Sequence, residues 1–176
     1  MSGLRLIATA PTPGLRRAEF GGDHPLDEGG TRAAHALRPT IITGDHPWVS
    51  SPAQAARQTA KALGREPARD ETLRDPSYGQ WTGLTLDQID PTAWLTDPTY
   101  APPGGESLTA VTARTGQWLD RHTGATLTAV AHPVVVRALL THALGLPAAA
   151  IWQLDIAPLA VVRLTHRASR WHLHLR

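Results

Sequence analysis

Apolar and polar positions follow two kinds of pattern along the chain. Short runs that are apolar or alternate in polarity predict strands at residues 4–10, 126–131, 160–165 and 170–175. Segments with apolar residues three or four apart, and a Gly or Pro near one end, predict helices at residues 30–37, 52–63, 107–122 and 134–144. Strands that alternate with helices of this length predict an α/β fold with a mostly parallel central sheet.

The carboxyl ends of the predicted strands indicate where a site should lie. In open sheets of this class, ligands bind at the carboxyl ends of the strands. This rule selects residues 8–12, the pair Ser50 and Ser51, and His132. Residues 75–103 are rich in Pro, Gly, Asp and Trp, and we expect a long excursion there with a short helix around residues 84–89. Because long loops often cap active sites, this excursion is expected near the same edge.

Composition limits the classes of protein to consider. At 176 residues with 41% hydrophobic content, the chain suits one compact domain, which we expect to span residues 1–176. Cysteine is absent, which excludes disulfides and thiolate metal ligands. The first apolar run is short and contains Arg5, so we expect a cytoplasmic protein with no secretory leader and no membrane association. The net charge is only +2 without a long basic run, so no nucleic-acid partner is expected.

Six stretches in a fixed order resemble one known family. They are LIATAPT, FGGDHPLDEGG, SSPAQAARQTAKALG, LRDPSYGQWTGLTLDQI, PPGGESLTAVTAR and AVAHPVVVRALLTHALGLP. Together they resemble the histidine phosphatase superfamily, also called phosphoglycerate-mutase-like, with a closer likeness to small bacterial phosphatases of the alpha-ribazole phosphatase type. The resemblance implies a three-layer α/β sandwich in which helices cover both faces of a mostly parallel sheet.

The resemblance also implies roles for single positions, and several of these positions carry other residues here. The family's phosphate-binding arginine falls on Ala8, its nucleophilic histidine on Thr9 and the following glycine on Ala10. A second family arginine falls on Ala55. Phosphoryl transfer depends on cations that position the phosphoryl group and offset its charge. We therefore expect that ordinary phosphohistidine catalysis is absent.

Two further positions keep side chains that could carry acid–base chemistry. The family's carboxylic acid, which protonates the leaving group, falls on Asp75, and the second family histidine falls on His132. The two could form an acid and base pair if folding brings them together. The structural alternatives are a loop carboxylate in water for Asp75 and an inherited residue satisfied by the backbone for His132.

The sequence leaves more than one function open. We expect a non-phosphatase ligand-binding or partner protein, a pseudophosphatase. The first alternative is a repurposed enzyme that acts on a weakly charged organic substrate with His132 and Asp75 as acid and base. A residual phosphatase is a weaker alternative. Thr9 could donate a hydrogen bond or shape the pocket, although a threonine nucleophile would need an adjacent base and an anion cradle.

The expected pocket combines small, hydroxyl and aromatic side chains. The candidate catalytic residues are His132, Asp75 and Thr9, and the candidate pocket residues are Ala8, Ala10, Thr12, Ala55 and Tyr78. His172 and His174 alternate along a predicted strand, but without a third ligand a solvated edge strand is the better interpretation. We expect no metal and no cofactor. The expected partner is a small organic ligand or another protein, and a homo-oligomer is possible.

Overall fold

A computed structural model describes residues 3–41 and 44–174. Six strands form one sheet in the order β3-β2-β4-β1-β5-β6. β1 and β2 pair in parallel with β4, and β3 pairs in parallel with β2, whereas β5 and β6 run antiparallel to their neighbours. The strands are β1 (Gly3–Ala8), β2 (Trp48–Ser50), β3 (Ala68–Arg69), β4 (Thr126–Ala131), β5 (Val161–Arg167) and β6 (Arg170–His174).

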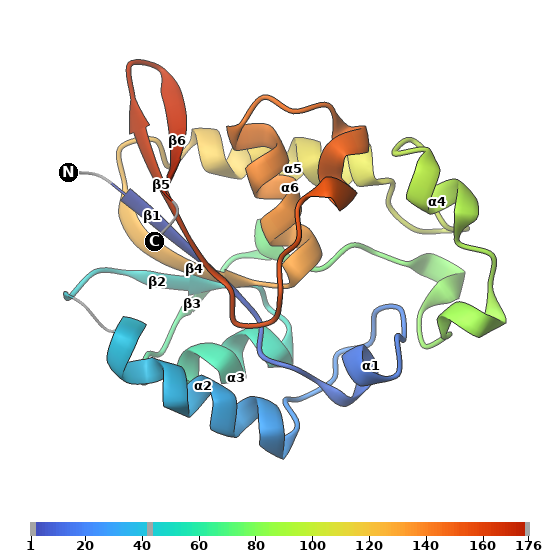
Figure 1. Ribbon diagram of the computed structural model, residues 1–176, viewed down its shortest axis with the longest axis horizontal. Helices are drawn as coiled ribbons and strands as arrows, with labels where there is room; N and C mark the ends of the chain where they lie inside the picture. Colours follow the sequence, from blue (N-terminus) through green and yellow to red (C-terminus); the bar gives the residue numbers. More distant parts are fainter. Residues whose placement is uncertain (1–2, 42–43, 175–176) are drawn as a thin grey trace.

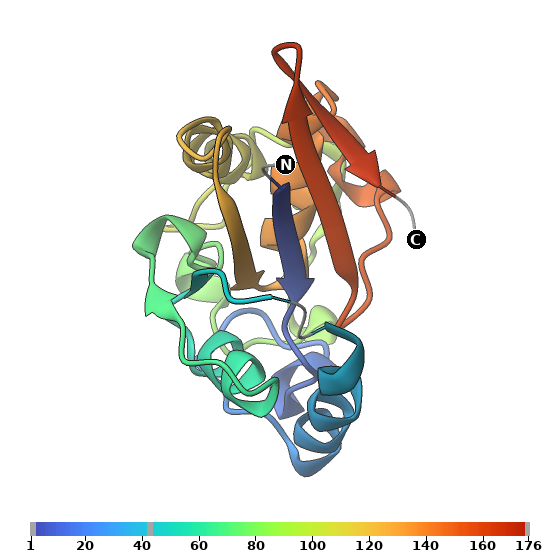
Figure 2. The same cartoon turned by 90° about the vertical axis from the view of Figure 1, so that its left-hand side faces the viewer.

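Helices cover both faces of this sheet (Figures 1 and 2). On one face lie α5 and α6, and on the other lie α2 and α3, as the sequence resemblance implied. The α-helices are α1 (Pro13–Arg16), α2 (Glu28–Ile41), α3 (Gln54–Ala62), α4 (Thr92–Thr96), α5 (Leu108–Asp120) and α6 (Pro133–Ala143), and the 3-10 helices are η1 (Glu71–Leu73), η2 (Gly79–Trp81), η3 (Leu86–Gln88) and η4 (Ala148–Gln153).

Side chains of β1 point alternately to the two faces of the sheet, which explains why a hydrophobic layer packs on each face. Leu4 and Leu6 pack with the core formed against α5 and α6, whereas Ile7 packs with the core against α2 and α3. Each of the three is at most 2% exposed. Successive side chains of a strand point to opposite faces, so one apolar strand joins two hydrophobic layers.

The observed elements differ from the predicted ones in three places. β1 ends at Ala8 rather than at residue 10, because the backbone N–H of Ala10 donates to the Thr59 hydroxyl instead of continuing a strand ladder. α2 continues to Ile41 although it contains Pro39. β2 and β3 were not predicted, since strands of three and two residues are too short to show a periodic pattern. Residue 175 of the last predicted strand lies outside the described residues.

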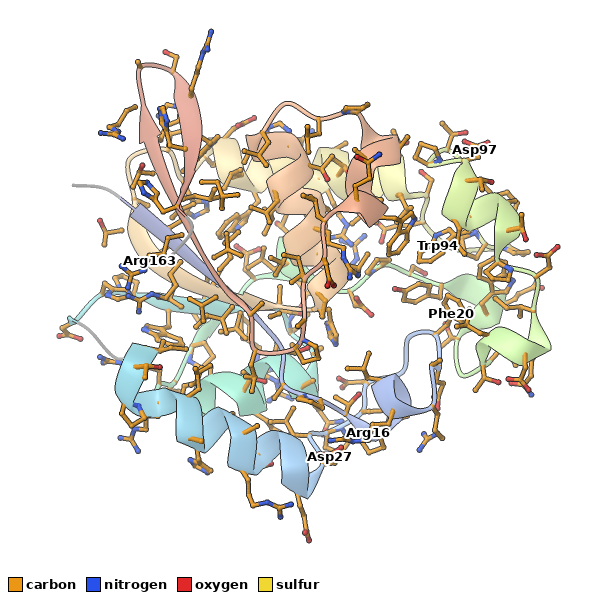
Figure 3. All side chains as sticks on the ribbon, viewed as in Figure 1. Arg16, Phe20, Asp27, Trp94, Asp97 and Arg163 are labelled. Carbon is orange, nitrogen blue, oxygen red and sulfur yellow. The ribbon has the colours of Figure 1, made fainter. Side chains whose placement is uncertain are left out.

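The excursion over residues 75–103 is anchored to the rest of the molecule by aromatic rings. Phe20 contacts Tyr78, Trp81 and Trp94 edge to face, with ring centroids 5.4 to 5.7 Å apart. Figure 3 shows Phe20 and Trp94 turned toward each other, and it shows Arg16 beside its ion-pair partner Asp27 on the neighbouring loop. The short helix of this excursion is α4, which begins after the expected residues 84–89, and those residues hold only η3. Among the described residues, no helix is long and apolar enough to span a lipid bilayer.

Candidate functional site

A cleft opens where the excursion passes the carboxyl end of β4. It comprises two cavities of about 320 and 200 Å³ that share part of their walls. The shared lining residues are Gly21, Gly22, Asp75, Tyr78 and His132. The site therefore lies at the sheet edge that the parallel-strand rule selects.

His132 is held rigidly at the junction of β4 and α6. It is the N-cap residue of α6, and its backbone carbonyl accepts hydrogen bonds from the N–H groups of Val135 and Val136. Pro133 follows at the first helical position, which fixes the helix start because its ring presets a helical φ. These contacts fix the backbone at His132, and its side chain is 19% exposed and lines the cleft.

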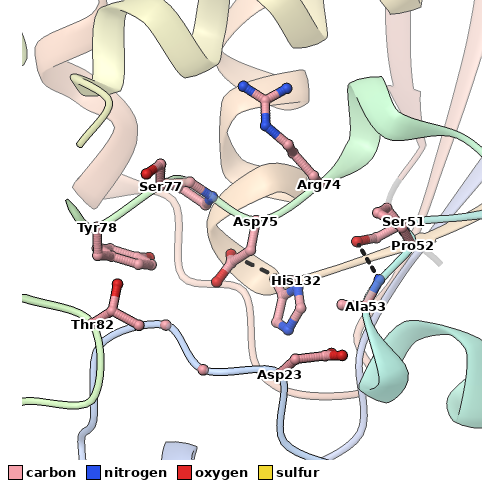
Figure 4. A pocket seen from close by; sticks show the side chains of 13 residues that line it. Asp23, Ser51, Pro52, Ala53, Arg74, Asp75, Ser77, Tyr78, Thr82 and His132 are labelled. Carbon is pink, nitrogen blue, oxygen red and sulfur yellow. Dashed lines mark hydrogen bonds and ion pairs between the residues drawn. The ribbon is translucent and has the colours of Figure 1, made fainter. Parts of the chain in front are cut away.

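Asp75 approaches His132 from the excursion. Its Oδ1 atom lies 3.7 Å from Nδ1 of His132, as Figure 4 shows. Neither of these two buried atoms has a hydrogen-bond partner among the described residues. Burial raises the pKa of the Asp75 carboxyl, and the nearby charges of His132 and Arg114 only partly oppose that effect. The pair is thus a carboxyl group biased toward its neutral form beside an imidazole.

Thr9, which directly follows β1, lies in the interior rather than in the cleft wall. Thr9 is 3% exposed, and Ala8, Ala10 and Ala55 are at most 1% exposed. The backbone N–H of Thr9 donates to the Ala131 carbonyl, which places position 9 beside the residue preceding His132. None of these four residues lines either cavity.

Thr12 and Tyr78 do line the cleft, and each also has a structural role. Thr12 is the N-cap of α1, where its hydroxyl accepts a hydrogen bond from the Leu15 backbone N–H, and it lines the smaller cavity. Tyr78 lines both cavities and packs edge to face on Phe20. Burial raises the pKa of the Tyr78 hydroxyl well above its ordinary value, so it stays a neutral donor.

Sequence reasoning missed a second imidazole–carboxylate pair at the cleft. His24 lines the smaller cavity, and its Nε2 atom lies 2.6 Å from Glu19 Oε1. A methyl group at Gly14 or Gly22 would come within 2.5 Å of this ring, so the two glycines leave the space that the ring occupies. His24 belongs to the stretch GGDHP that supported the family resemblance, but its spacing gave no signal of a role.

Asp23 and Arg137 were also missed. Asp23 lines the larger cavity and accepts a hydrogen bond of 2.6 Å from the Gln54 backbone N–H at the start of α3. Arg137 lies on α6 and lines the smaller cavity. Within residues 3–41 and 44–174, no cluster of three or more His, Cys, Asp or Glu residues could hold a metal ion. His174 instead contacts the Thr165 hydroxyl across the β5–β6 hairpin at 2.8 Å.

Comparisons with known sequences agree with this architecture. The sequence model of the histidine phosphatase superfamily, branch 1, matches residues 12–176. A bifunctional protein from Mycobacterium tuberculosis is 33% identical over 164 residues, which is 83% of this chain and 45% of that protein. The chain thus spans about half the length of the curated relatives that it matches first. A glucosyl-3-phosphoglycerate phosphatase from Mycobacterium tuberculosis is 42% identical over 76 residues, covering 38% of this chain and 34% of that enzyme.

Solved structures extend the similarity over nearly the whole chain. A mycobacterial glucosyl-3-phosphoglycerate phosphatase superposes with a TM-score of 0.86 at 29% identity, covering 98% of this chain and 96% of that one. A putative alpha-ribazole-5'-P phosphatase from Escherichia coli superposes with a TM-score of 0.85 at 22% identity, covering 99% and 95%. At that lower identity, the second likeness supports the fold alone.

These findings contradict the expectation of a non-phosphatase binding or partner protein. That expectation rested on Ala8, Thr9 and Ala55, which stand where the family has its phosphate-binding and nucleophilic residues. Instead, His132 and Asp75 converge at an open cleft. One of the relatives and one of the structural neighbours reported above are named as glucosyl-3-phosphoglycerate phosphatases. Nothing in these findings shows that the substitutions at positions 8, 9 and 55 mark a lost catalytic site.

Proposed function

Because the chain belongs to the histidine phosphatase superfamily, we propose that it hydrolyses the phosphate monoester of a small organic molecule. The observation that carries this proposal is the pairing of His132 with Asp75, 3.7 Å apart, at the wall common to both cavities. The names of the mycobacterial glucosyl-3-phosphoglycerate phosphatases support the same reaction class.

His132 is the proposed base. Position 9 is threonine, so the imidazole that reacts has to come from another element. The Nδ1 side of the His132 ring faces Asp75, and the opposite edge of the ring points toward the loop that carries Asp23 (Figure 4). In the proposed reaction Nε2 of His132 accepts a proton from a water molecule, whose oxygen forms a bond to phosphorus.

Asp75 is the proposed acid. Burial raises the pKa of its carboxyl, which favours the protonated form that can donate to a leaving oxygen. As the ester P–O bond breaks, the proton of Asp75 passes to the departing oxygen, and an alcohol and inorganic phosphate result. Return of one proton from His132 to Asp75 then restores both groups.

Phosphate release from a panel of phosphate monoesters, including p-nitrophenyl phosphate and phosphoserine, tests this proposal. General acid–base catalysis contributes about 100- to 10,000-fold, so His132→Ala and Asp75→Asn should each lower kcat/KM by that order. His172→Ala is the matched control, because it removes an exposed imidazole of β6 that lines neither cavity. Turnover that is unchanged in His132→Ala, or no phosphate release from any ester by the unmodified protein, would contradict the proposal.

A further inference from the structure

Arg137 extends from α6 into the same cleft as His132. It lies in the second turn of the helix that His132 caps, and it lines the smaller cavity together with Tyr78 and Trp152. The side chain is 21% exposed. Because Arg137, Asp75 and His132 line one cavity, the organic part of an ester whose phosphoryl group lies at His132 would share that cavity with Arg137.

The guanidinium is held in one orientation by two contacts. Its Nε atom donates to the Leu154 carbonyl at 2.7 Å, and its central carbon lies 5.5 Å from the centre of the Trp152 ring. These contacts occupy the inner edge and one face of the group. A guanidinium that is fixed before binding loses little conformational entropy when it forms further hydrogen bonds.

The charge of Arg137 is poorly compensated within the described part of the chain. Its nearest carboxylate is Asp155, 3.9 Å from Nη2 and fully exposed. Its terminal nitrogens make no hydrogen bond to any residue in the ranges 3–41 and 44–174. Burial lowers the pKa of Arg137, although the charge of Asp155 opposes this effect, which is consistent with a partly desolvated cation.

Two other basic side chains of the cleft are already paired at close range. Arg74 lies 3.0 Å from Glu106, and His24 lies 2.6 Å from Glu19. Arg137 is therefore the cation best placed to bind an external anion. The Glu19 carboxylate lines the same cavity, so an anionic group of one charge is favoured over one of two charges.

We propose that the terminal nitrogens of Arg137 bind a carboxylate on the organic part of the ester, so that the protein selects phosphate monoesters that also carry a carboxylate. This inference deepens the proposed hydrolysis and rests on it, because that proposal is what makes the ligand a phosphate monoester. A planar fork of two nitrogens matches the two oxygens of a carboxylate, and the Trp152 ring beneath it excludes water from one face.

Titration calorimetry with two non-hydrolysable probes tests the inference without requiring turnover. The probes are 3-phosphonopropionate, which has a carboxylate, and propylphosphonate, which has a methyl group in its place. We expect the unmodified protein to bind the first about tenfold to a hundredfold more tightly, the range for one charge-assisted hydrogen-bonded pair. Arg137→Gln should abolish this preference, and Arg137→Lys should keep part of it because it retains the charge.

Arg32→Gln is the matched control, because it removes an exposed guanidinium on α2 that pairs with Glu28 at 3.5 Å and lines neither cavity. Circular dichroism of each variant establishes folding. Equal affinity of the unmodified protein for the two probes would overturn the inference, and so would a preference that survives Arg137→Gln. If Arg137→Gln weakens binding of inorganic phosphate as much as that of 3-phosphonopropionate, Arg137 holds the phosphoryl group, which also overturns it. Failure of the monoester assay alone would remove the hydrolysis and leave this binding result standing.

Discussion

At the scale of single residues, Asp75 has the most unusual environment among the carboxyl groups of the cleft. Burial raises its pKa, while the imidazole beside it only partly offsets that effect. A carboxyl whose pKa is higher in the folded than in the unfolded state stabilises the fold fully below the unfolded pKa of about 3.9. That stabilisation is lost as the pH rises through the folded pKa.

Asp75→Asn should therefore change the pH dependence of stability. Asparagine does not titrate, so the free energy of unfolding of the variant, relative to that of the unmodified protein, should increase between pH 4 and pH 8. Urea unfolding at several pH values measures this difference. A relative stability that falls over the same interval would show that the folded state lowers the pKa of Asp75.

Glu106→Gln provides a comparison of opposite sign. Burial works to raise the pKa of Glu106, but hydrogen bonds from Arg114 and Ser77 outweigh it, and the net shift is downward. A lowered pKa gives stability that is present above the unfolded pKa and lost as the pH falls through the folded one. The Gln variant should therefore be most destabilised near neutral pH and less so near pH 4.

At the scale of elements, the excursion depends on a close backbone crossing at Gly79. Its φ is +52°, and a methyl group there would come within 2.1 Å of the Pro103 carbonyl oxygen. Gly83 has a φ of +83° but no atom within 4 Å of such a methyl group. A comparison of alanine variants at these two positions therefore separates the cost of a positive φ from the cost of steric overlap.

Gly79→Ala should destabilise the protein much more than Gly83→Ala. The positive φ alone costs roughly 1–2 kcal/mol in either variant. Gly79→Ala must in addition displace backbone atoms, for which we expect at least about 2 kcal/mol more, together with impaired turnover because neighbouring Tyr78 lines the cleft. Thermal unfolding of both variants is the measurement. Equal losses would mean that the crossing is not tight in solution.

The observed helices and strands show which elements a sequence pattern can predict. All four predicted helices form, because each has an apolar face of three turns or so that a periodic pattern reveals. α2 is longer than predicted, since burial of Ile41 continues the helix beyond Pro39. β2 forms by pairing with β4, and β3 forms by pairing with β2. Each has too few residues to show a periodic pattern of apolar positions.

At the scale of the whole molecule, one sheet connects two hydrophobic layers. That residues 1–176 form a single domain stays a prediction. A single domain implies one cooperative unfolding transition. Leu139 of α6 is fully buried, and its replacement by alanine should cost about 2–5 kcal/mol. The exposed Leu144 at the end of α6 is the control, for which we expect less than about 1 kcal/mol.

Urea unfolding, followed by tryptophan fluorescence and by circular dichroism, tests both the single transition and the cost of Leu139→Ala. Trp48 belongs to the layer with α2 and α3, whereas Trp118 belongs to the layer with α5 and α6. In Leu139→Ala the two signals should change together at a lower urea concentration. Two separate transitions would show that the layers unfold independently.

The fold class, the positions of the long helices and the family could all be predicted from the amino-acid sequence, because hydrophobic periodicity and ordered motifs are local features of the chain. The family resemblance also indicated Asp75 and His132 as candidates, and the sequence also indicated Tyr78. The burial of Thr9, the contact of Asp75 with His132 and the presence of His24 and Arg137 in the same cleft became visible with the folded structure. These outcomes depend on contacts between segments distant in sequence. No local pattern encodes them, since the packing of the sheet and its two helical layers sets which side chains reach the cleft.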